Sequence, residues 1–160
     1  MSRAFVKETD SEAIEELPDR PISPHPNIVT PTGLAQIEAE VARLQAGYAA
    51  AQARKDHVAL ASLARDLRYW TARHASAEKA PAPPDAEEVR FGTRVTIVRE
   101  DGRRQTYRIV GEDEADPARG TLSYVAPLAR LLMGKHVGDT VALGSQEIEV
   151  VAIEVAATAM

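Results

Sequence analysis

The strongest constraint on the fold is a pair of side-chain stripes with the same spacing. Positions that can pack recur every three or four residues at Leu34, Ile37, Val41, Leu44, Tyr48 and Ala51, and again at Leu60, Leu63, Leu67, Trp70, His74 and Ala77. This spacing is typical of an α-helix that buries one side against a single partner. The short polar connection Arg54-Lys55-Asp56-His57 predicts an antiparallel hairpin in which Asp56 caps the second helix.

The ends of the hairpin are marked by residues that start and stop helices. Thr30 can cap the first helix, and Pro31 suits its first turn. Pro81, Pro83 and Pro84 end the second helix. We therefore predict a coiled-coil hairpin over residues 30–80, with arms of about 30 to 36 Å, and a proline-rich linker over 81–88.

The segment before the hairpin has a different composition. Residues 1–31 hold six acidic and three basic side chains together with five of the ten prolines, and they show no helical or strand period. Such a segment buries too little apolar surface to offset the entropy of ordering it. We predict a disordered acidic arm over residues 1–29.

After the linker the pattern becomes that of strands. The segments Thr93–Arg99 and Gln105–Val110 flank an Asp101-Gly102 turn, Thr121–Val125 follows a loop, and a last hairpin joins Thr140–Leu143 to Glu147–Val155. Pro127 opens a short helix over Leu128–Met133 that Gly134 ends. The fold class is therefore α+β: the helical hairpin is followed, over residues 89–157, by an antiparallel sheet with one short helix.

The sequence contains no arrangement typical of an enzyme active site. Its histidines, His25, His57, His74 and His136, fall in four different segments. We interpret His74 as a partly buried packing residue of the helix seam. The motifs of zinc hydrolysis, thiol redox chemistry and phosphate-binding loops are missing, and there is no cysteine. The acidic run Glu112–Asp116 lacks the alternating ligands and central glycine of a calcium loop, which favours a solvated loop.

Charge narrows the choice of partner. The net charge of −5 argues against a general nucleic-acid or acidic-membrane binder and favours a protein partner. The hairpin alone is basic, with seven basic and five acidic side chains over residues 32–79. This is either an ordinary solvated helix surface or a means of steering toward an acidic channel or nucleic acid. Neither a membrane-spanning run nor a signal peptide is present, so we expect a cytoplasmic protein.

Four collinear segments of the C-terminal half resemble the C-terminal domain of bacterial Gre transcript-cleavage factors: Tyr107–Asp116, Leu122-Ser123, Pro127–Lys135 and Val137–Asp139. The opening Val29–Leu34, with Ile37 and Glu40–Leu44, resembles the first helix of that family. Asp66–Thr71 resembles the end of its second helix. The resemblance covers residues 29–156.

This resemblance implies a function. The coiled coil would enter the secondary channel of RNA polymerase, and an FKBP-like C-terminal domain would dock at the channel rim. The implied docking residues are Ser123, Tyr124, Val125, Ala126, Pro127 and Arg130. In the family, acidic residues at the hairpin tip help to hold magnesium at the active centre of the polymerase, which then hydrolyses backtracked RNA. The factor is not itself an enzyme. The expected partner is the RNA polymerase core, with nucleic acid contacted only indirectly, and we expect a bacterial monomer without a cofactor of its own.

The tip departs from the family pattern. No Gly-Asp-x-Ser-Glu-Asn-like string occurs between Gly33 and Tyr69, and each arm is shorter by about 13 Å. Asp56 is the single carboxylate of the predicted tip, and a role as helix cap is favoured over a magnesium contact. Val125-Ala126 stands where the family has polar residues. We therefore expect a polymerase regulator with little or no stimulation of cleavage.

Three alternatives stay open at this point. The chain could resemble the nucleoside diphosphate kinase regulators, which share the C-terminal fold and also bind polymerase. It could be a true cleavage factor that uses Asp56 as a lone metal ligand. A peptidyl-prolyl isomerase is suggested only by the FKBP-like fold, and a fold does not carry an activity.

Overall fold

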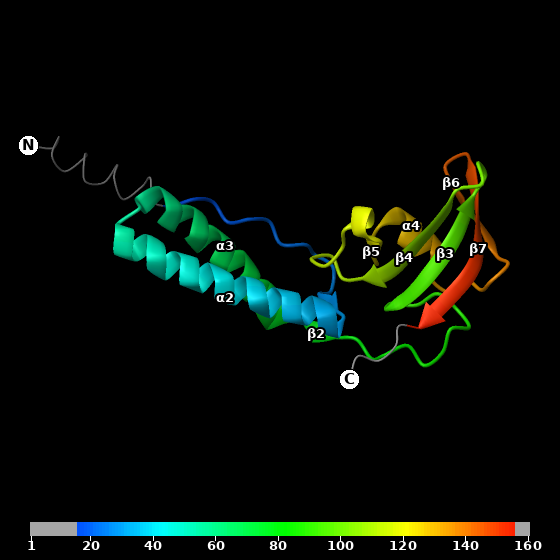
Figure 1. Ribbon diagram of the computed structural model, residues 1–160, viewed down its shortest axis with the longest axis horizontal. Helices are drawn as coiled ribbons and strands as arrows, with labels where there is room; N and C mark the ends of the chain where they lie inside the picture. Colours follow the sequence, from blue (N-terminus) through cyan, green and yellow to red (C-terminus); the bar gives the residue numbers. More distant parts are fainter. Residues whose placement is uncertain (1–15, 156–160) are drawn as a thin grey trace, which may run out of the picture. The chain divides into compact units, whose positions relative to one another are not determined.

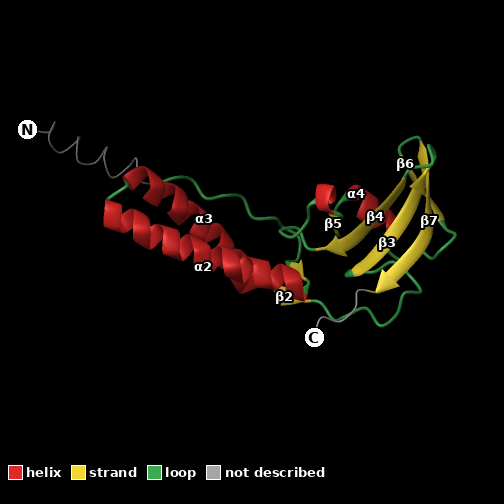
Figure 2. Ribbon diagram, viewed as in Figure 1, coloured by secondary structure: helices red, strands yellow, loops and turns green. Residues whose placement is uncertain are grey.

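The computed structural model describes residues 16–155, which form two compact units (Figures 1 and 2). One unit contains residues up to Pro24 together with Ala35–Ala77, and the other contains His25–Leu34 and the chain from Glu78 onward. The first unit is helical and the second is built on a sheet. Within residues 16–155, no helix has both the length and the apolar character needed to cross a membrane.

The predicted helical hairpin is confirmed. Helix α2 runs over Pro31–Arg54 and helix α3 over His57–Ser76, and the two lie antiparallel (Figure 1). The hydroxyl of Thr30 accepts a hydrogen bond of 2.9 Å from the backbone N–H of Gly33, as expected of an N-cap. Beyond Ser76 the backbone becomes extended at Ala77, before the first proline of the linker.

The seam of the hairpin is well predicted for α2 and less well for α3. Ile37, Leu44 and Ala51 of α2 are buried. In α3 the buried side chains are Ala61 and Arg73, whereas the predicted leucines are half-buried. The segment that precedes the hairpin contacts Asp66, Arg68 and Tyr69, so α3 has contacts beyond the predicted stripe.

The interpretation of His74 as a packing residue of the seam is wrong. The histidine is exposed, and its Nε2 lies 3.4 Å from Oε2 of Glu38. The neighbouring Arg73, which is 2% exposed, takes the buried position. The aliphatic stem of an arginine can pack against apolar neighbours, but a guanidinium buried this deeply also needs polar partners.

The prediction of a disordered arm does not hold for the part of it that the structure describes. Leu17, Asp19 and Arg20 contact α3, and Ile28–Val29 forms strand β1. Composition alone favoured disorder, but cation–π and ion-pair contacts to the hairpin hold residues 16–20 in place. Residues 1–15 of the predicted arm lie outside the described residues.

The second unit is a five-stranded sheet in the order β5-β4-β3-β7-β6. Its strands are β3 (Thr93–Arg99), β4 (Arg104–Val110), β5 (Thr121–Ser123), β6 (Thr140–Leu143) and β7 (Gln146–Val155). Three of the four pairings are antiparallel as predicted, but β5 runs parallel to β4. The connection over residues 111–120, with the short 3₁₀ helix η1 (Pro117–Arg119), carries the chain back so that Thr121 pairs with Arg108 of β4.

The core of this unit lies between the sheet and the short helix α4 (Pro127–Leu132). The helix contributes Leu128, Ala129 and Leu132, and the sheet contributes alternate residues that include Val95, Ile97, Ile109, Ile148 and Val150. The side chains between them in sequence belong to the opposite face of the sheet. One face of the sheet is therefore packed and the other is accessible.

Residues from before the hairpin complete the second unit. Strand β1 (Ile28–Val29) pairs in parallel with β2 (Glu78–Lys79). The hydroxyl of Thr30 donates a 2.6 Å hydrogen bond to Oε1 of Glu114, so the predicted solvated loop has a structural contact. At Gly111 the backbone passes so close to Ile28 that an added Cβ would lie 2.3 Å from the carbonyl oxygen of Ile28.

Two glycine substitutions test this close approach. We expect Gly111→Ala to lower the free energy of unfolding by about 2 kcal/mol, because backbone atoms must move to admit the methyl group. The control is Gly47→Ala, whose new methyl would meet only the flexible end of Leu63 in the middle of α2. We expect this change to be neutral or stabilising by up to about 1 kcal/mol, because alanine favours the helix. Denaturant unfolding measures both variants; equal losses would contradict the packing described for Gly111.

Candidate functional site

The hairpin tip is a two-residue connection. Helix α2 ends at Arg54, Lys55 adopts a left-handed backbone with φ of 56°, and α3 begins at His57. Asp56 between them is the N-cap of α3, and its Oδ1 accepts a 3.1 Å hydrogen bond from the backbone N–H of Ala59. The capping role predicted for this residue is therefore present in the structure.

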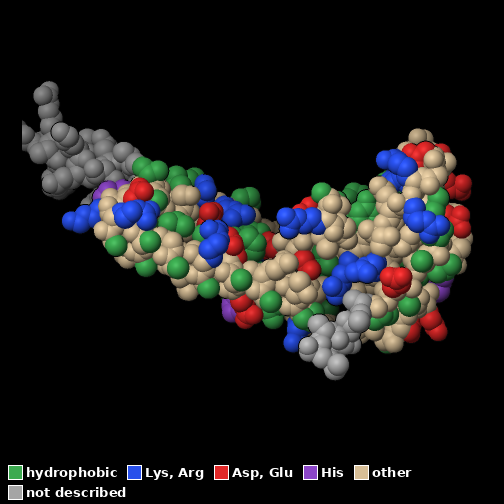
Figure 3. All heavy atoms as spheres, viewed as in Figure 1, with side chains coloured by type: hydrophobic (Ala, Val, Ile, Leu, Met, Phe, Trp, Pro, Cys, Tyr) green, Lys and Arg blue, Asp and Glu red, His purple; other side chains and the backbone are tan. Residues whose placement is uncertain are grey.

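The charge at the tip is mainly positive. The second carboxylate oxygen of Asp56 lies 3.8 Å from Nη2 of Arg54. Arg54, Lys55 and His57 are exposed, and Val58 beside them is 77% exposed. Figure 3 shows basic and histidine side chains gathered at this end of the hairpin. The tip is thus a small basic surface with an apolar side chain, and its one carboxylate is already bonded to the backbone.

The tip residues do not fit a magnesium site. Magnesium in proteins is held by carboxylates that have oxygens free to bind it. Here one oxygen of Asp56 caps α3, the other faces a guanidinium group, and the two neighbouring side chains on the N-terminal side are cations. Within residues 16–155 no group of three or more His, Asp or Glu side chains is placed to hold a metal ion.

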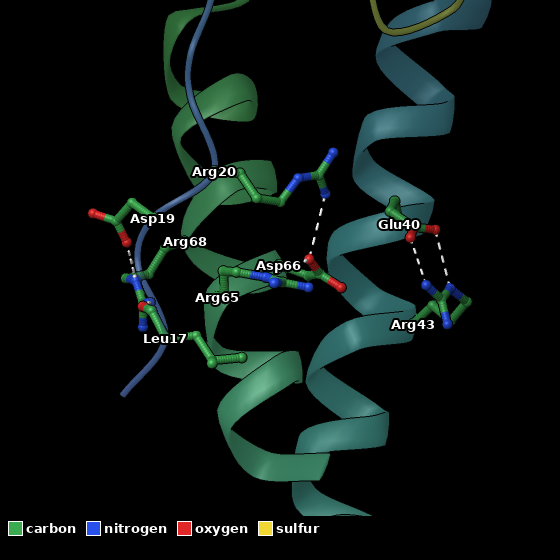
Figure 4. Close-up of polar contacts among 8 residues, drawn as sticks. All are labelled: Leu17, Asp19, Arg20, Glu40, Arg43, Arg65, Asp66 and Arg68. Carbon is green, nitrogen blue, oxygen red and sulfur yellow. Dashed lines mark hydrogen bonds and ion pairs between the residues drawn. The ribbon is translucent and has the colours of Figure 1, made fainter. Parts of the chain in front are cut away.

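A segment from the arm lies along the flank of α3. Arg20 places its guanidinium 4.0 Å from the centre of the Tyr69 ring and 6.0 Å from that of Trp70, and its Nη1 lies 3.4 Å from Oδ1 of Asp66. On the same helix, Arg68 donates a 2.9 Å hydrogen bond to the carbonyl of Leu17 and pairs with Asp19 (Figure 4). The arm thus contributes the cation to one ion pair with α3 and the anion to another.

The α2 side of this region carries its own ion pair. Arg43 donates a 3.0 Å hydrogen bond from Nε to Glu40, one turn before it in α2 (Figure 4). This hydrogen bond lowers the pKa of the Glu40 carboxyl below its usual value. Both residues lie within one helix, so their hydrogen bonds support α2 itself, while the charge of Arg20 in the arm adds a smaller lowering of the Glu40 pKa.

The predicted docking residues form a turn followed by a helix start. Ser123 ends β5, and its hydroxyl accepts a 3.2 Å hydrogen bond from the N–H of Val125, while its carbonyl accepts one of 3.0 Å from Ala126. Pro127 occupies the first turn of α4 and is exposed. These bonds fix the turn. The backbone at Val125-Ala126 is therefore held by the hydroxyl and the carbonyl of Ser123, and not by polar side chains at positions 125 and 126.

Tyr124 fixes this turn to the rest of the unit. Its ring meets Phe91 edge to face at 5.7 Å between centroids, its N–H donates to Val110, and its hydroxyl donates to the carbonyl of Pro26. Tyr124 therefore positions the turn, and its hydroxyl is already engaged.

The outward side of α4 offers side chains to a partner. Pro127 and Arg130 are exposed, one turn apart, and Met133 follows at 37% exposure. Arg130 forms no ion pair or side-chain hydrogen bond with any other described residue. Val137 in the next loop is 57% exposed. The mixture of one free cation and several apolar side chains is typical of a protein contact.

The structure thus places the predicted residues in two groups. Arg54–His57 belong to the helical unit, and Ser123–Pro127 with Arg130 belong to the sheet unit. Sequence reasoning missed Arg20 and its contacts with Tyr69 and Asp66. A cation in a proline-rich arm has no periodic signal, although the adjacent Tyr69-Trp70 pair in a helix is an available cation partner.

Comparison of the sequence with known proteins indicates the class of protein. Residues 83–156 match the family model described as transcription elongation factor, GreA/GreB, C-term. The curated transcription elongation factor GreB of Neisseria meningitidis serogroup B is 41% identical over 96 residues, which is 56% of this chain and 59% of that protein. The transcription elongation factor GreA of Alkalilimnicola ehrlichii is 46% identical over 79 residues, or 46% of this chain and 50% of that protein. The matches thus span three fifths or less of these relatives.

Residues 83–156 thus carry a match to the C-terminal domain of the Gre-type transcription elongation factors. Among solved structures, GreA factor homolog 1 (Gfh1) of Thermus thermophilus is 21% identical and covers 81% of this chain and 99% of its own, with a TM-score of 0.39. The GreA/GreB factor of Nitrosomonas europaea is 17% identical, with 79% and 98% coverage and a TM-score of 0.40.

The cap at Asp56 can be tested separately from its charge. We expect Asp56→Ala to lower the free energy of unfolding of the hairpin by about 1 kcal/mol, because the Ala59 N–H loses its acceptor. We expect Asp56→Asn to cost less than half of that, because asparagine is also a good N-cap. Thermal unfolding followed by circular dichroism compares the two. Equal losses would show that the cap hydrogen bond is not what Asp56 contributes.

The contact between arm and helix has a built-in reporter, because Trp70 is the single tryptophan of the chain. We expect Arg20→Ala to raise the acrylamide quenching of Trp70 fluorescence and to reduce the stability of the helical unit by about 1 kcal/mol, through loss of the cation–π contact. Arg43→Ala is the matched control, since the hydrogen bonds of Arg43 go to Glu40 of the same helix and not to the arm. Quenching that changes equally in both variants would refute the arm contact.

Proposed function

We propose that this protein binds the RNA polymerase core at its secondary channel and modulates elongation or initiation with little or no stimulation of transcript cleavage. The match of residues 83–156 to the GreA/GreB C-terminal model, and the 41% identity with a GreB factor over 96 residues, support the kind of partner. The proposal further includes action as a monomer in the bacterial cytoplasm, and nucleic acid is contacted only through the transcription complex.

The observation that carries the reduced-cleavage part of the proposal is the state of Asp56. A carboxylate that supplements the metal ligands of the polymerase needs oxygens free to bind the metal. Asp56 uses one oxygen to cap α3 and turns the other toward Arg54. The tip that would enter the channel therefore offers cations and the exposed Val58.

Docking is assigned to the turn and the start of α4. The hydrogen bonds of Ser123 fix the turn before binding, which reduces the entropy lost on association. Pro127 and Arg130 then meet the partner from one side of a helix whose other side is buried in the core. Arg130 supplies a charge without an internal partner, which suits an acidic position at the channel rim.

The nearest rival, a relative of the nucleoside diphosphate kinase regulators, also binds polymerase and shares this docking prediction. A cleavage factor that depends on Asp56 is the rival that makes a different prediction. No described feature of the sheet unit favours peptidyl-prolyl isomerase activity, so the protein is proposed to act as a regulator and not as an enzyme.

Binding is tested with purified RNA polymerase core. We expect the wild-type chain to be retained by immobilised core enzyme, and Arg130→Glu to weaken the affinity tenfold or more, because a charge at the contact is reversed. Pro127→Ala should weaken it by a smaller factor. The control is Arg119→Glu in η1, whose side chain is also highly exposed but lies outside the docking turn. No retention of the wild-type chain would refute the proposal, and equal losses for Arg119→Glu and Arg130→Glu would refute the assigned surface.

Cleavage is tested on backtracked elongation complexes. We expect RNA shortening with the protein to stay within about twofold of the rate of the polymerase alone. Asp56→Asn keeps the helix cap and removes the charge, so it separates metal chemistry from folding. Magnesium-dependent shortening that the wild-type chain stimulates and Asp56→Asn abolishes would establish the cleavage factor instead.

A further inference from the structure

The sheet has a second face that α4 leaves uncovered. On β3 and β4 the residues that alternate with the core side chains point to this face. We call the surface formed by these residues the outer face. Its residues are Arg94, Thr96, Val98, Arg104, Thr106 and Arg108. Figure 3 shows basic and acidic side chains side by side over the sheet domain. Arg94, Arg104 and Thr106 are exposed, and the other three are half-buried.

Two arginines face each other at close range on this surface. Arg94 and Arg108 are direct cross-strand partners. The backbone N–H of Arg108 donates to Gly120 on the β5 side, at 2.9 Å, and therefore does not point toward β3. The two residues thus form a non-hydrogen-bonded pair, in which side chains of antiparallel strands come closest. The next such pair, Thr96 and Thr106, has its hydroxyls 3.0 Å apart.

The described residues neutralise little of this charge. Arg94 has one long ion pair, 3.9 Å to Glu154. Arg104 and Arg108 form no side-chain hydrogen bond or ion pair with other described residues, and the Nε of Arg108 is buried with no hydrogen-bond partner. Like charges placed directly opposite destabilise a sheet, and a buried polar group without a partner adds to that cost. The outer face is therefore complementary to an anionic partner.

The composition of the face selects among anionic partners. It holds no aromatic side chain on which a base could stack. The neighbouring strand β7 carries Glu147, Glu149 and Glu154, which would repel a long phosphate backbone. A second copy of the chain is disfavoured by area: five strands about 4.8 Å apart give a face of roughly 500 to 600 Å², below the roughly 800 Å² per partner of a standard interface. These features favour a short acidic protein segment.

We propose that the outer face binds an extended acidic segment of a partner protein that runs along β4. Arg104 and Arg108 lie four residues apart, which is about 14 Å along a strand. An extended segment presents side chains at i, i+2 and i+4 toward one side with the same spacing. The matching pattern is therefore an acidic residue at i, a small or hydroxyl residue at i+2 over the threonine pair, and an acidic residue at i+4. This inference does not rest on the proposed polymerase contact.

Two peptides of identical composition test the spacing. The probe is Thr-Glu-Val-Ser-Val-Glu-Thr, with acids four apart, and the control is Thr-Glu-Val-Ser-Glu-Val-Thr, with acids three apart and hence on opposite sides of an extended chain. We expect the full-length protein to bind the labelled probe at least tenfold more tightly than the control, as measured by fluorescence anisotropy at low salt. The probe should dissociate as salt is raised, because the contact is a surface ion pair. Equal affinity for the two peptides would overturn the proposal.

Matched variants assign the surface. We expect Arg108→Gln and Arg104→Gln each to weaken probe binding fivefold or more, and Arg103→Gln to leave it unchanged, because Arg103 pairs with Asp101 in the neighbouring turn. Denaturation midpoints of the variants verify that each remains folded, and retention on RNA polymerase core, measured in parallel, separates this surface from the docking turn.

An unchanged affinity in folded Arg108→Gln would overturn the proposal. Displacement of the probe by single-stranded DNA at lower concentration than by unlabelled probe would assign the face to nucleic acid instead. Self-association that Arg108→Gln abolishes would assign it to a second copy.

Discussion

Two helices alone bury little apolar surface, so the helical unit depends on additional packing from the segment that precedes them. The seam of α2 contributes Ile37, Leu44 and Ala51, one of which is only a methyl group. Most stability of helices in proteins comes from packing of an apolar stripe rather than from the helix itself. The arm adds a further layer without a further helix, because Arg20 covers the ring of Tyr69 and pairs with Asp66. An acidic, proline-rich segment thus becomes part of the packing.

The tip shows how one carboxylate is committed by local structure. A helix that follows a two-residue connection has free N–H groups in its first turn, and Asp56 is the residue in position to accept from one of them. With one oxygen bonded to the Ala59 N–H and Arg54 3.8 Å from the other, the side chain has less free oxygen to offer a metal ion than an uncapped carboxylate. Structural capping and metal recruitment compete for one residue, and a hairpin this short has no second acid at its end.

Much of the fold could be predicted from sequence because periodic patterns report on burial against one partner. The strand Thr93–Arg99 and the helix cap at Asp56 were predicted as the structure has them. The parallel pairing of β5 with β4 was missed, because the direction of a three-residue strand depends on how the preceding loop folds back. The order of residues 16–20 was missed for another reason: it depends on contacts between Arg20 and residues more than forty positions away, which no local pattern encodes.

For the candidate site, the sequence identified the residues but not their burial or their neighbours in the fold. Pro127 and Arg130 were predicted from a resemblance, and the structure places both on the accessible side of α4. Burial of Arg73 in place of His74 shows the limit of a stripe drawn at regular spacing, since a rotation of one residue about the helix axis changes which side chain is inside. Charge sums over segments gave no indication that Arg94 and Arg108 would be neighbours, because that follows from strand register alone.

The close packing of Gly111 against Ile28 and the hydrogen bond from Thr30 to Glu114 mean that the sheet unit is discontinuous in sequence. Its first strand is made before the hairpin, and the rest is made after it. The hairpin is in effect an insertion whose two ends are held together by the pairing of β1 with β2. Insertions at such a junction can lengthen or shorten with little effect on the host domain. Hairpin length is thus a quantity that evolution could adjust separately from docking. During synthesis the ribosome also releases the completed hairpin before the strands β3 to β7 of the sheet unit.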